Sequence, residues 1–313
     1  MDVRRAGKHG VTMRLDSIVI GLDFSAPSIS SAKWVAEHFA PTAELTLVHV
    51  IDLPGRPHFA RELVPSLDEI ERAARDFAEP ELRKLAAFLS ESVTHTEVRV
   101  GKPHEEIANI ARERNADLIV IGPHGDRARR SRFLGTTAER IVRTSVIPVL
   151  VATEPPNTAP RSVLVPVDDA SITPLVLEST RDLALIFDAD VTLLHVWSNA
   201  DYSHVASMAY ATSANEAQAK SEIDKDLHDS AVHWLEHLAT TGIARERVTA
   251  LVTYGRAGEK IVQVAHSSAA DLIIMGARGS GLVLPALLGS TVASVLHEAR
   301  CPVMVVPDAG RGA

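Results

Sequence analysis

Several features that are common in other classes of protein are scarce in this sequence. Among 313 residues there is one cysteine, Cys301, which excludes a disulfide framework and suits a reducing compartment. No apolar run approaches the roughly 20 residues that cross a bilayer, and the polar, basic stretch 1–14 lacks the apolar core of a secretory signal. The formal net charge of −8 gives no general reason to bind nucleic acid. We therefore expect a globular cytoplasmic protein with neither a membrane nor a nucleic-acid partner.

Familiar catalytic and phosphate-binding motifs are missing as well. The sequence contains no G-x4-G-K-[ST], which excludes the P-loop mechanism with its phosphate-binding lysine. No G-x-G-x-x-G follows a first strand, which argues against a dinucleotide fold of the Rossmann kind. No G-x-S-x-G occurs either. We therefore predict no catalytic residues and no metal ligands from motifs alone.

The chain instead contains two copies of one pattern. The repeated segments are 17–23 and 162–168, 46–50 and 192–196, 116–122 and 270–276, and 147–151 and 301–305. The offset is 145 residues at the first pair (17 to 162) and 154 at the last (147 to 301), so the second copy has an insertion of about eight residues after its second strand. We predict domains at 15–153 and 161–308, joined by a proline-rich linker at 154–160.

Each copy has the pattern of an α/β domain. Short β-branched runs indicate strands buried on both faces of a parallel sheet, and amphipathic stretches such as 27–40 and 104–115 indicate helices between them. Segment 66–89 is also helix-like, but Pro80 should break or kink it. The alternation predicts two doubly wound sheets, in which ligands bind beyond the carboxyl ends of the strands.

One glycine motif follows the fourth strand of each copy with identical spacing. Gly122–Thr136 and Gly276–Ser290 both read G-x2-G-x9-G-[ST], and a helix pattern follows each. Glycines permit positive φ and let backbone N–H groups approach phosphate oxygens, while a helix N-terminus favours negative charge. The alternative is that the glycines only make turns and the hydroxyls only cap helices. A carboxylate ending the first strand, Asp23 or Asp168, would face a ribose hydroxyl or a metal on the phosphates.

Together these motifs resemble the universal stress protein family in its ATP-binding form. The matching features are the strand-end Asp, T-L-x-H-V, Gly101 and Gly255 before the third helix, A-D-L-I-x-x-G, the glycine motif and the final P-V-[LM]-V. The resemblance covers residues 15–308. It implies two five-stranded parallel sheets of the adenine nucleotide alpha hydrolase type with strand order 3-2-1-4-5.

The resemblance also implies one ATP site per copy, with or without Mg, in a stress- or dormancy-related cytoplasmic regulator or sensor that forms homodimers; its regulatory partner is not implied. In the first copy the resemblance places adenine near Asp23 and Val50. The residues that it implies for nucleotide binding in the first copy are Asp23, Val50, Gly101, Gly122, Gly125, Gly135, Thr136 and Thr137. In the second copy they are Asp168, Val196, Gly255, Gly276, Gly279, Gly289, Ser290 and Thr291. Nothing in the sequence identifies a general base or an activated nucleophile, which favours binding over turnover. The alternatives are a slow ATPase or ATP-using transferase, and an interaction scaffold that has lost its nucleotide.

The two copies differ at the predicted site. The first copy has D-F-S with Ser25, whereas the second has D-D-A-S with Ser171, and Pro166 stands where the first copy has Gly21. The nine-residue spacer contains four arginines in the first copy (Arg127, Arg129, Arg130, Arg132) and apolar residues in the second (Val283, Leu284, Leu287, Leu288). The arginines either cover the γ-phosphate or an acidic partner, or form a solvated loop. The asymmetry predicts two ATP sites that are not equivalent, with the second departing further from the family pattern.

Other chemically active side chains have structural interpretations. His228, His233 and His237 favour a helix surface over a metal site, and His49 and His195 favour a shared structural hydrogen bond. His124 in the first loop aligns with Arg278, so only a polar donor is required there. Cys301 aligns with Ile147 and indicates core packing.

Pro148 and Pro302 place the last strands at open edges, and we hypothesise that the two copies pair through these edges.

Overall fold

The computed structural model describes residues 15–39, 43–53, 67–89, 94–125, 134–168, 170, 172–197, 225, 228–237, 245–278 and 288–308. The first copy comprises β1 (Ser17–Leu22), α1 (Ala26–His38), β2 (Glu44–Ile51), α2 (Leu67–Leu89), β3 (Thr94–Val100), α3 (Pro103–Glu113), β4 (Leu118–Ile121), α4 (Thr136–Thr144) and β5 (Val149–Val151). The second comprises β6 (Ser162–Pro166), α5 (Thr173–Phe187), β7 (Asp190–Trp197), the 3-10 helix η3 (Arg245–Arg247), β8 (Val248–Tyr254), α8 (Ala257–Ser267), β9 (Leu272–Gly276), α9 (Ser290–Glu298) and β10 (Val303–Val306). The predicted eight-residue insertion lies outside the described residues.

The strands confirm the predicted fold of each copy. Their order is β3-β2-β1-β4-β5 in the first copy and β8-β7-β6-β9-β10 in the second, and all strand pairs within a copy are parallel. This is the 3-2-1-4-5 order, in which β1 and β4 lie side by side. None of the described helices is long and apolar enough to cross a bilayer.

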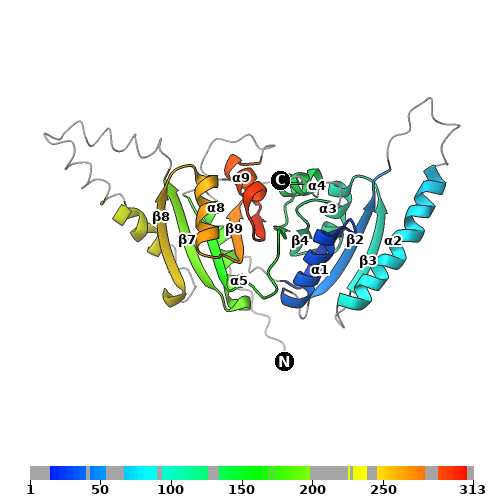
Figure 1. Ribbon diagram of the computed structural model, residues 1–313, viewed down its shortest axis with the longest axis horizontal. Helices are drawn as coiled ribbons and strands as arrows, with labels where there is room; N and C mark the ends of the chain where they lie inside the picture. The colour runs from blue at the N-terminus through cyan, green and yellow to red at the C-terminus, as the bar shows by residue number, and fades with distance from the viewer. Residues whose placement is uncertain are drawn as a thin grey trace.

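The last strands of the two copies join the sheets into one. β10 pairs antiparallel with β5, with Val303 opposite Val151 and Met304 opposite Leu150, so the hypothesis that the copies pair through these strands is confirmed. The result is a ten-stranded sheet whose outer strands are β3 and β8 (Figure 1). Because the junction pair is antiparallel, the carboxyl end of β5 lies beside the amino end of β10.

Each face of this sheet carries an apolar core that spans both copies. Alternate residues of β1 belong to different cores, since Ile18 and Ile20 pack with α1 while Val19 packs with α3. At the junction, Leu150 and Met304 lie on the α1 face and are fully buried. The continuity of both cores across the junction follows from the period-two alternation of side chains in strands.

Aromatic side chains and the linker reinforce the junction. Phe39 of the first copy contacts Phe187 of the second with ring centroids 4.7 Å apart, and Trp34 lies 4.8 Å from Phe39. The indole N–H of Trp34 donates to the carbonyl of Thr158 in the linker at 3.0 Å. The linker is therefore attached to α1, and the copies contact each other well beyond one pair of strands.

A repeated aspartate fixes the amino ends of the strands. The Asp117 carboxylate accepts the backbone N–H groups of Asp16 and Ser17, at 2.9 and 3.0 Å. Asp271 does the same for Arg161 and Ser162, again at 2.9 and 3.0 Å. The aspartate of the A-D-L-I motif thus binds β4 to β1, and β9 to β6, at the end of the sheet opposite the predicted ligand site.

The expected break at Pro80 is absent. Helix α2 runs from Leu67 to Leu89 with Pro80 inside it. A proline removes one helical hydrogen bond, but Ala78 and Leu82 on either side are fully buried. Their burial stabilises both halves of the helix and outweighs the loss of that bond.

Candidate functional site

The carboxyl ends of β1 and β4 bring the predicted first-site residues together. The two strands pair in register up to Gly21 and Ile121, so the chain leaves them at neighbouring points toward Asp23 and Gly122. Gly125 then lies so close to Asp23 that a Cβ on Gly125 would collide with the Asp23 carboxylate oxygen Oδ2. Only a glycine fits at this position without displacing the carboxylate.

Asp23 is held by its own loop. Its Oδ1 accepts the backbone N–H of Ser25 at 3.0 Å, and the Ser25 hydroxyl accepts the N–H of Ser28 at 3.3 Å as the N-cap of α1. One carboxylate oxygen therefore fixes the β1–α1 turn while the other faces the glycine loop. This arrangement suits an acceptor for a hydroxyl group or a ligand for a cation.

Gly135 stands at the start of α4, as predicted, in an ordinary backbone conformation. Its φ of −65° and ψ of 145° are ordinary extended values, and among the described glycines only Gly101 and Gly255 have positive φ. Of the two properties of glycine that the sequence suggested, positive φ is therefore not used at the described loop glycines Gly122, Gly125, Gly135, Gly276 and Gly289. Close approach applies to some of them: a Cβ on Gly135 would lie 3.3 Å from the Pro123 carbonyl oxygen and from His124 Cα, whereas a Cβ on Gly122 or Gly289 would make only ordinary contacts.

The first turn of α4 exposes the groups predicted to hold phosphate. Thr136 is exposed and Thr137 half-buried, and Gly135 supplies no side-chain cap. The first amides of a helix have no partner within it. The N–H of Gly135 itself donates to the carbonyl of Pro123 at 2.7 Å, which removes it from the predicted phosphate donors.

The second copy repeats this arrangement with differences. Asp168 Oδ1 accepts the N–H of Ala170 at 3.1 Å, the counterpart of the Asp23 turn, and Gly289 precedes α9 as Gly135 precedes α4. Ser290 is exposed and Thr291 half-buried, as in the first copy. Gly279, Ser171 and the spacer residues Val283, Leu284 and Leu287 lie outside the described residues, as do the four spacer arginines of the first copy.

Pro166 and Ile172 account for the main structural differences at the second site. The β6–β9 pairing extends only to Leu164 and Ile273, two residues short of Pro166, which has no N–H to donate. The Ile172 side chain approaches Gly276, where a Cβ would lie 2.8 Å from Ile172 Cγ2. In the first copy the corresponding glycine, Gly122, faces the backbone of Ser28 instead.

The predicted adenine side contains an aromatic cluster in each copy that sequence reasoning missed. Phe24, at φ 61°, lies 4.6 Å from the His49 ring and 5.6 Å from Phe77. In the second copy the His195 ring lies 5.5 Å from Trp197 and 5.4 Å from Trp234. Val50 and Val196 follow the two histidines at the ends of β2 and β7. Only Trp197 directly follows a T-L-x-H-V motif, whereas Phe24, Phe77 and Trp234 lie far from it in the sequence, so no local pattern indicated either cluster.

The two histidines and the two positive-φ glycines have structural roles. His49 Nδ1 lies 2.8 Å from the Leu22 carbonyl oxygen, and His195 Nδ1 lies 3.0 Å from that of Val167, so the predicted shared hydrogen bond is confirmed. Gly101 (φ 152°) and Gly255 (φ 138°) turn the chain after β3 and β8, a conformation that favours glycine. The backbone conformation alone therefore explains why glycine stands at these two positions, whether or not a ligand binds nearby.

The three histidines of segment 228–237 lie on the surface of a helix, as predicted. His228, His233 and His237 are all exposed on the helical residues 228–237. Across the ranges that the structure describes, no group of three or more His, Cys, Asp or Glu side chains is placed to hold a metal ion.

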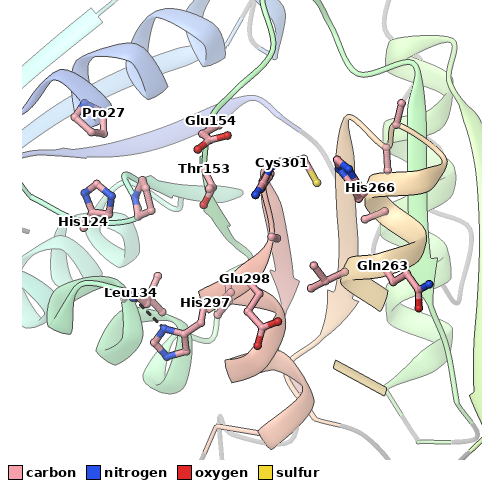
Figure 2. A pocket seen from close by; sticks show the side chains of 18 residues that line it. Pro27, His124, Leu134, Thr153, Glu154, Gln263, His266, His297, Glu298 and Cys301 are labelled. Atoms are coloured by element: carbon pink, nitrogen blue, oxygen red, sulfur yellow. Dashed lines mark hydrogen bonds between the residues drawn. The ribbon is translucent and has the colours of Figure 1, made fainter. Parts of the chain in front are cut away.

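A cavity of about 1190 Å³ lies between the copies beside the first glycine loop. Figure 2 shows His124 and Leu134 of the first copy on one side and His266, His297 and Cys301 of the second on the other. The buried Nδ1 of His124 has no hydrogen-bond partner in the described part of the chain.

Cys301 lines this cavity but belongs to the core, as predicted. It is 9% exposed, and burial, followed by the negative charge of Asp271, raises the pKa of its thiol from 9.0 to about 12. At pH 8 only about one thiol in 10,000 is then ionised, and the thiolate is the reactive form. We expect iodoacetamide to label Cys301 at least about 100-fold more slowly in the folded protein than in guanidinium chloride. Equal rates, followed by mass spectrometry, would contradict the buried assignment.

Comparisons with known proteins agree with this architecture. The model of the universal stress protein family matches residues 15–153 and again 160–307. The universal stress protein Rv2005c of Mycobacterium tuberculosis is 27% identical over 300 residues, covering 92% of this chain and 96% of the relative; Rv2623 of the same organism is 26% identical over 306 residues, covering 93% and 96%. The crystal structure of a universal stress protein from Archaeoglobus fulgidus has a TM-score of 0.66 at 20% identity and covers 94% of this chain and 97% of its own. That structural likeness supports the fold.

Proposed function

Because this chain belongs to the universal stress protein family and carries two of its domains in tandem, we propose that it is an ATP-binding sensor or regulator with one nucleotide site in each copy. The observation that carries the proposal is the close approach of Gly125 to Asp23, which leaves no room for a Cβ beside the carboxylate. It joins the glycine loop to the strand-end carboxylate at the edge of the sheet where this class of fold binds ligands.

The chemistry of the first site suits a nucleotide. The first turn of α4 offers backbone amides and the Thr136 and Thr137 hydroxyls to an anion. The Asp23 carboxylate would repel a bare phosphate. We therefore assign Asp23 to a ribose hydroxyl or to a magnesium ion that accompanies the phosphates, and the Phe24–His49 cluster to the side of the base.

The second site has the same plan with weaker support. Asp168, Gly276, Gly289, Ser290 and Thr291 correspond to residues of the first site, but Ile172 approaches the first glycine of the loop. Pro166 also ends the β6–β9 pairing early. We propose that both sites bind ATP and that the first binds it more tightly.

The proposal extends to location and assembly. We propose that the protein acts in the cytoplasm in a stress or dormancy response and forms homodimers. The outer strands β3 and β8 support dimer formation, because in the described chain each pairs with a neighbour on one side only. Nucleotide occupancy would then alter the surface offered to a second copy or to a regulatory protein.

The test begins with the purified protein. We expect mass spectrometry of the released small molecules to find an adenine nucleotide, and calorimetry with ATP and Mg to give two equivalents per chain. Absence of both results would overturn the proposal and favour a scaffold without nucleotide. Rapid, repeated phosphate release would instead identify an enzyme, either an ATPase or an ATP-using transferase.

A further inference from the structure

One hydrogen bond connects the first glycine loop to the second copy. The backbone N–H of Leu134 donates to Nδ1 of His297 at 3.1 Å, and Figure 2 shows this bond crossing from one copy to the other. Leu134 is the residue directly before Gly135, and it is 8% exposed. The donor is therefore part of the predicted phosphate loop, whereas the acceptor lies on α9.

The bond sets the course of the chain into α4. The N–H of Leu134, in the peptide before this residue, is bound to His297. The N–H of Gly135, in the next peptide, donates to the carbonyl of Pro123 at 2.7 Å. These two bonds orient consecutive peptides immediately before Thr136. The direction of the first free amides of α4, and hence the position of any phosphate on them, depends on both bonds.

The chemistry of the acceptor is specific. Nδ1 must keep its lone pair, so the ring is neutral and its proton is on Nε2. At the corresponding position of the first copy stands Arg143 (297 less the offset of 154), and a guanidinium group has no acceptor. Arg143 therefore cannot accept a reciprocal bond from Leu288 of the second glycine loop.

We propose that His297 is a positioning residue for the first nucleotide site, supplied by the second copy. This inference rests on the proposed function and extends it, because the first site then requires both copies for full affinity while the second does not. Helix α9 also links the two sites physically. Its first residues, Ser290 and Thr291, belong to the second site. Its last turn carries His297, which accepts the hydrogen bond from the first loop.

The experiment uses the full chain with Gly289→Glu, so that only the first site is measured by calorimetry with ATP. In this background we expect His297→Leu to weaken ATP binding about tenfold, because Leu134 keeps a buried N–H without a partner. His297→Asn should stay within about twofold of the parent, since the Asn Oδ1 can take the place of Nδ1 as acceptor. Amide exchange at Leu134 should accelerate in His297→Leu and remain slow in His297→Asn.

The matched control is His266→Leu. His266 lines the same cavity from the last turn of α8 and is exposed, so its loss should leave ATP affinity unchanged. Parent affinity retained in His297→Leu, or an equal loss in His297→Asn, would overturn the inference while leaving the ATP site intact. If the Gly289→Glu parent fails to bind ATP, the proposed function of the first site fails first, and the inference fails with it.

Discussion

Gly135→Glu should abolish ATP binding at the first site and leave one equivalent bound per chain. The new carboxylate would enter the space in front of α4, where the phosphates are proposed to lie, and place a negative charge against them. Like charges brought together in a binding site cost several kcal/mol, which corresponds to a loss of about 100-fold or more in affinity. Calorimetric stoichiometry measures this directly. Gly289→Glu should remove the other equivalent by the same mechanism.

Neutral substitutions separate the effect of charge from that of bulk. A Cβ on Gly289 would lie 3.4 Å from the Ala277 carbonyl oxygen, an ordinary contact, whereas a Cβ on Gly135 is tighter at 3.3 Å from two backbone atoms. Gly289→Gln, which has the shape of glutamate without its charge, should therefore retain more affinity than Gly289→Glu. A double Glu variant that still bound two equivalents of ATP would show that the loops are not the nucleotide sites.

The parts of this molecule that follow from local patterns were predictable from sequence. The repeat and the runs of β-branched residues predicted two copies of one parallel-sheet domain, and the family resemblance implied their strand order. Pro148 and Pro302 correctly placed β5 and β10 at the edge of each copy's own five strands, and these two edges pair with each other at the centre of the ten-stranded sheet. His49 and His195 were predicted to make one hydrogen bond because they recur, and they do.

The features that sequence did not predict depend on tertiary contacts. The glycine spacing suggested positive φ or close approach, but it did not indicate that Gly125 lies against the Asp23 carboxylate, because the two residues meet only when β1 and β4 pair. Pro80 does not end α2 because burial on both sides outweighs a local preference. The bond from Leu134 to His297 joins residues 163 positions apart, which no local pattern can relate.

The junction between β5 and β10 brings those residues together. Leu150 and Met304 face each other in the antiparallel β5–β10 pair, and both are fully buried. We expect Leu150→Ala and Met304→Ala each to lower the free energy of unfolding by about 2 to 5 kcal/mol, because each leaves a cavity in the core shared by the two copies. Urea unfolding followed by tryptophan fluorescence measures the change.

The double variant tests whether the copies are stabilised as one unit. Side chains in contact are coupled, so the two losses should differ from a simple sum by about 0.5 to 3 kcal/mol. Leu185→Ala on α5 is the control: Leu185 is 69% exposed, and its loss should change stability by less than about 0.5 kcal/mol. If the two junction variants were strictly additive and each destabilised only its own copy, as amide exchange in β1 and β6 would report, the copies would be independent domains. The first glycine loop could not then rely on a histidine from the second copy, because that bond forms only while the junction holds α9 against the loop.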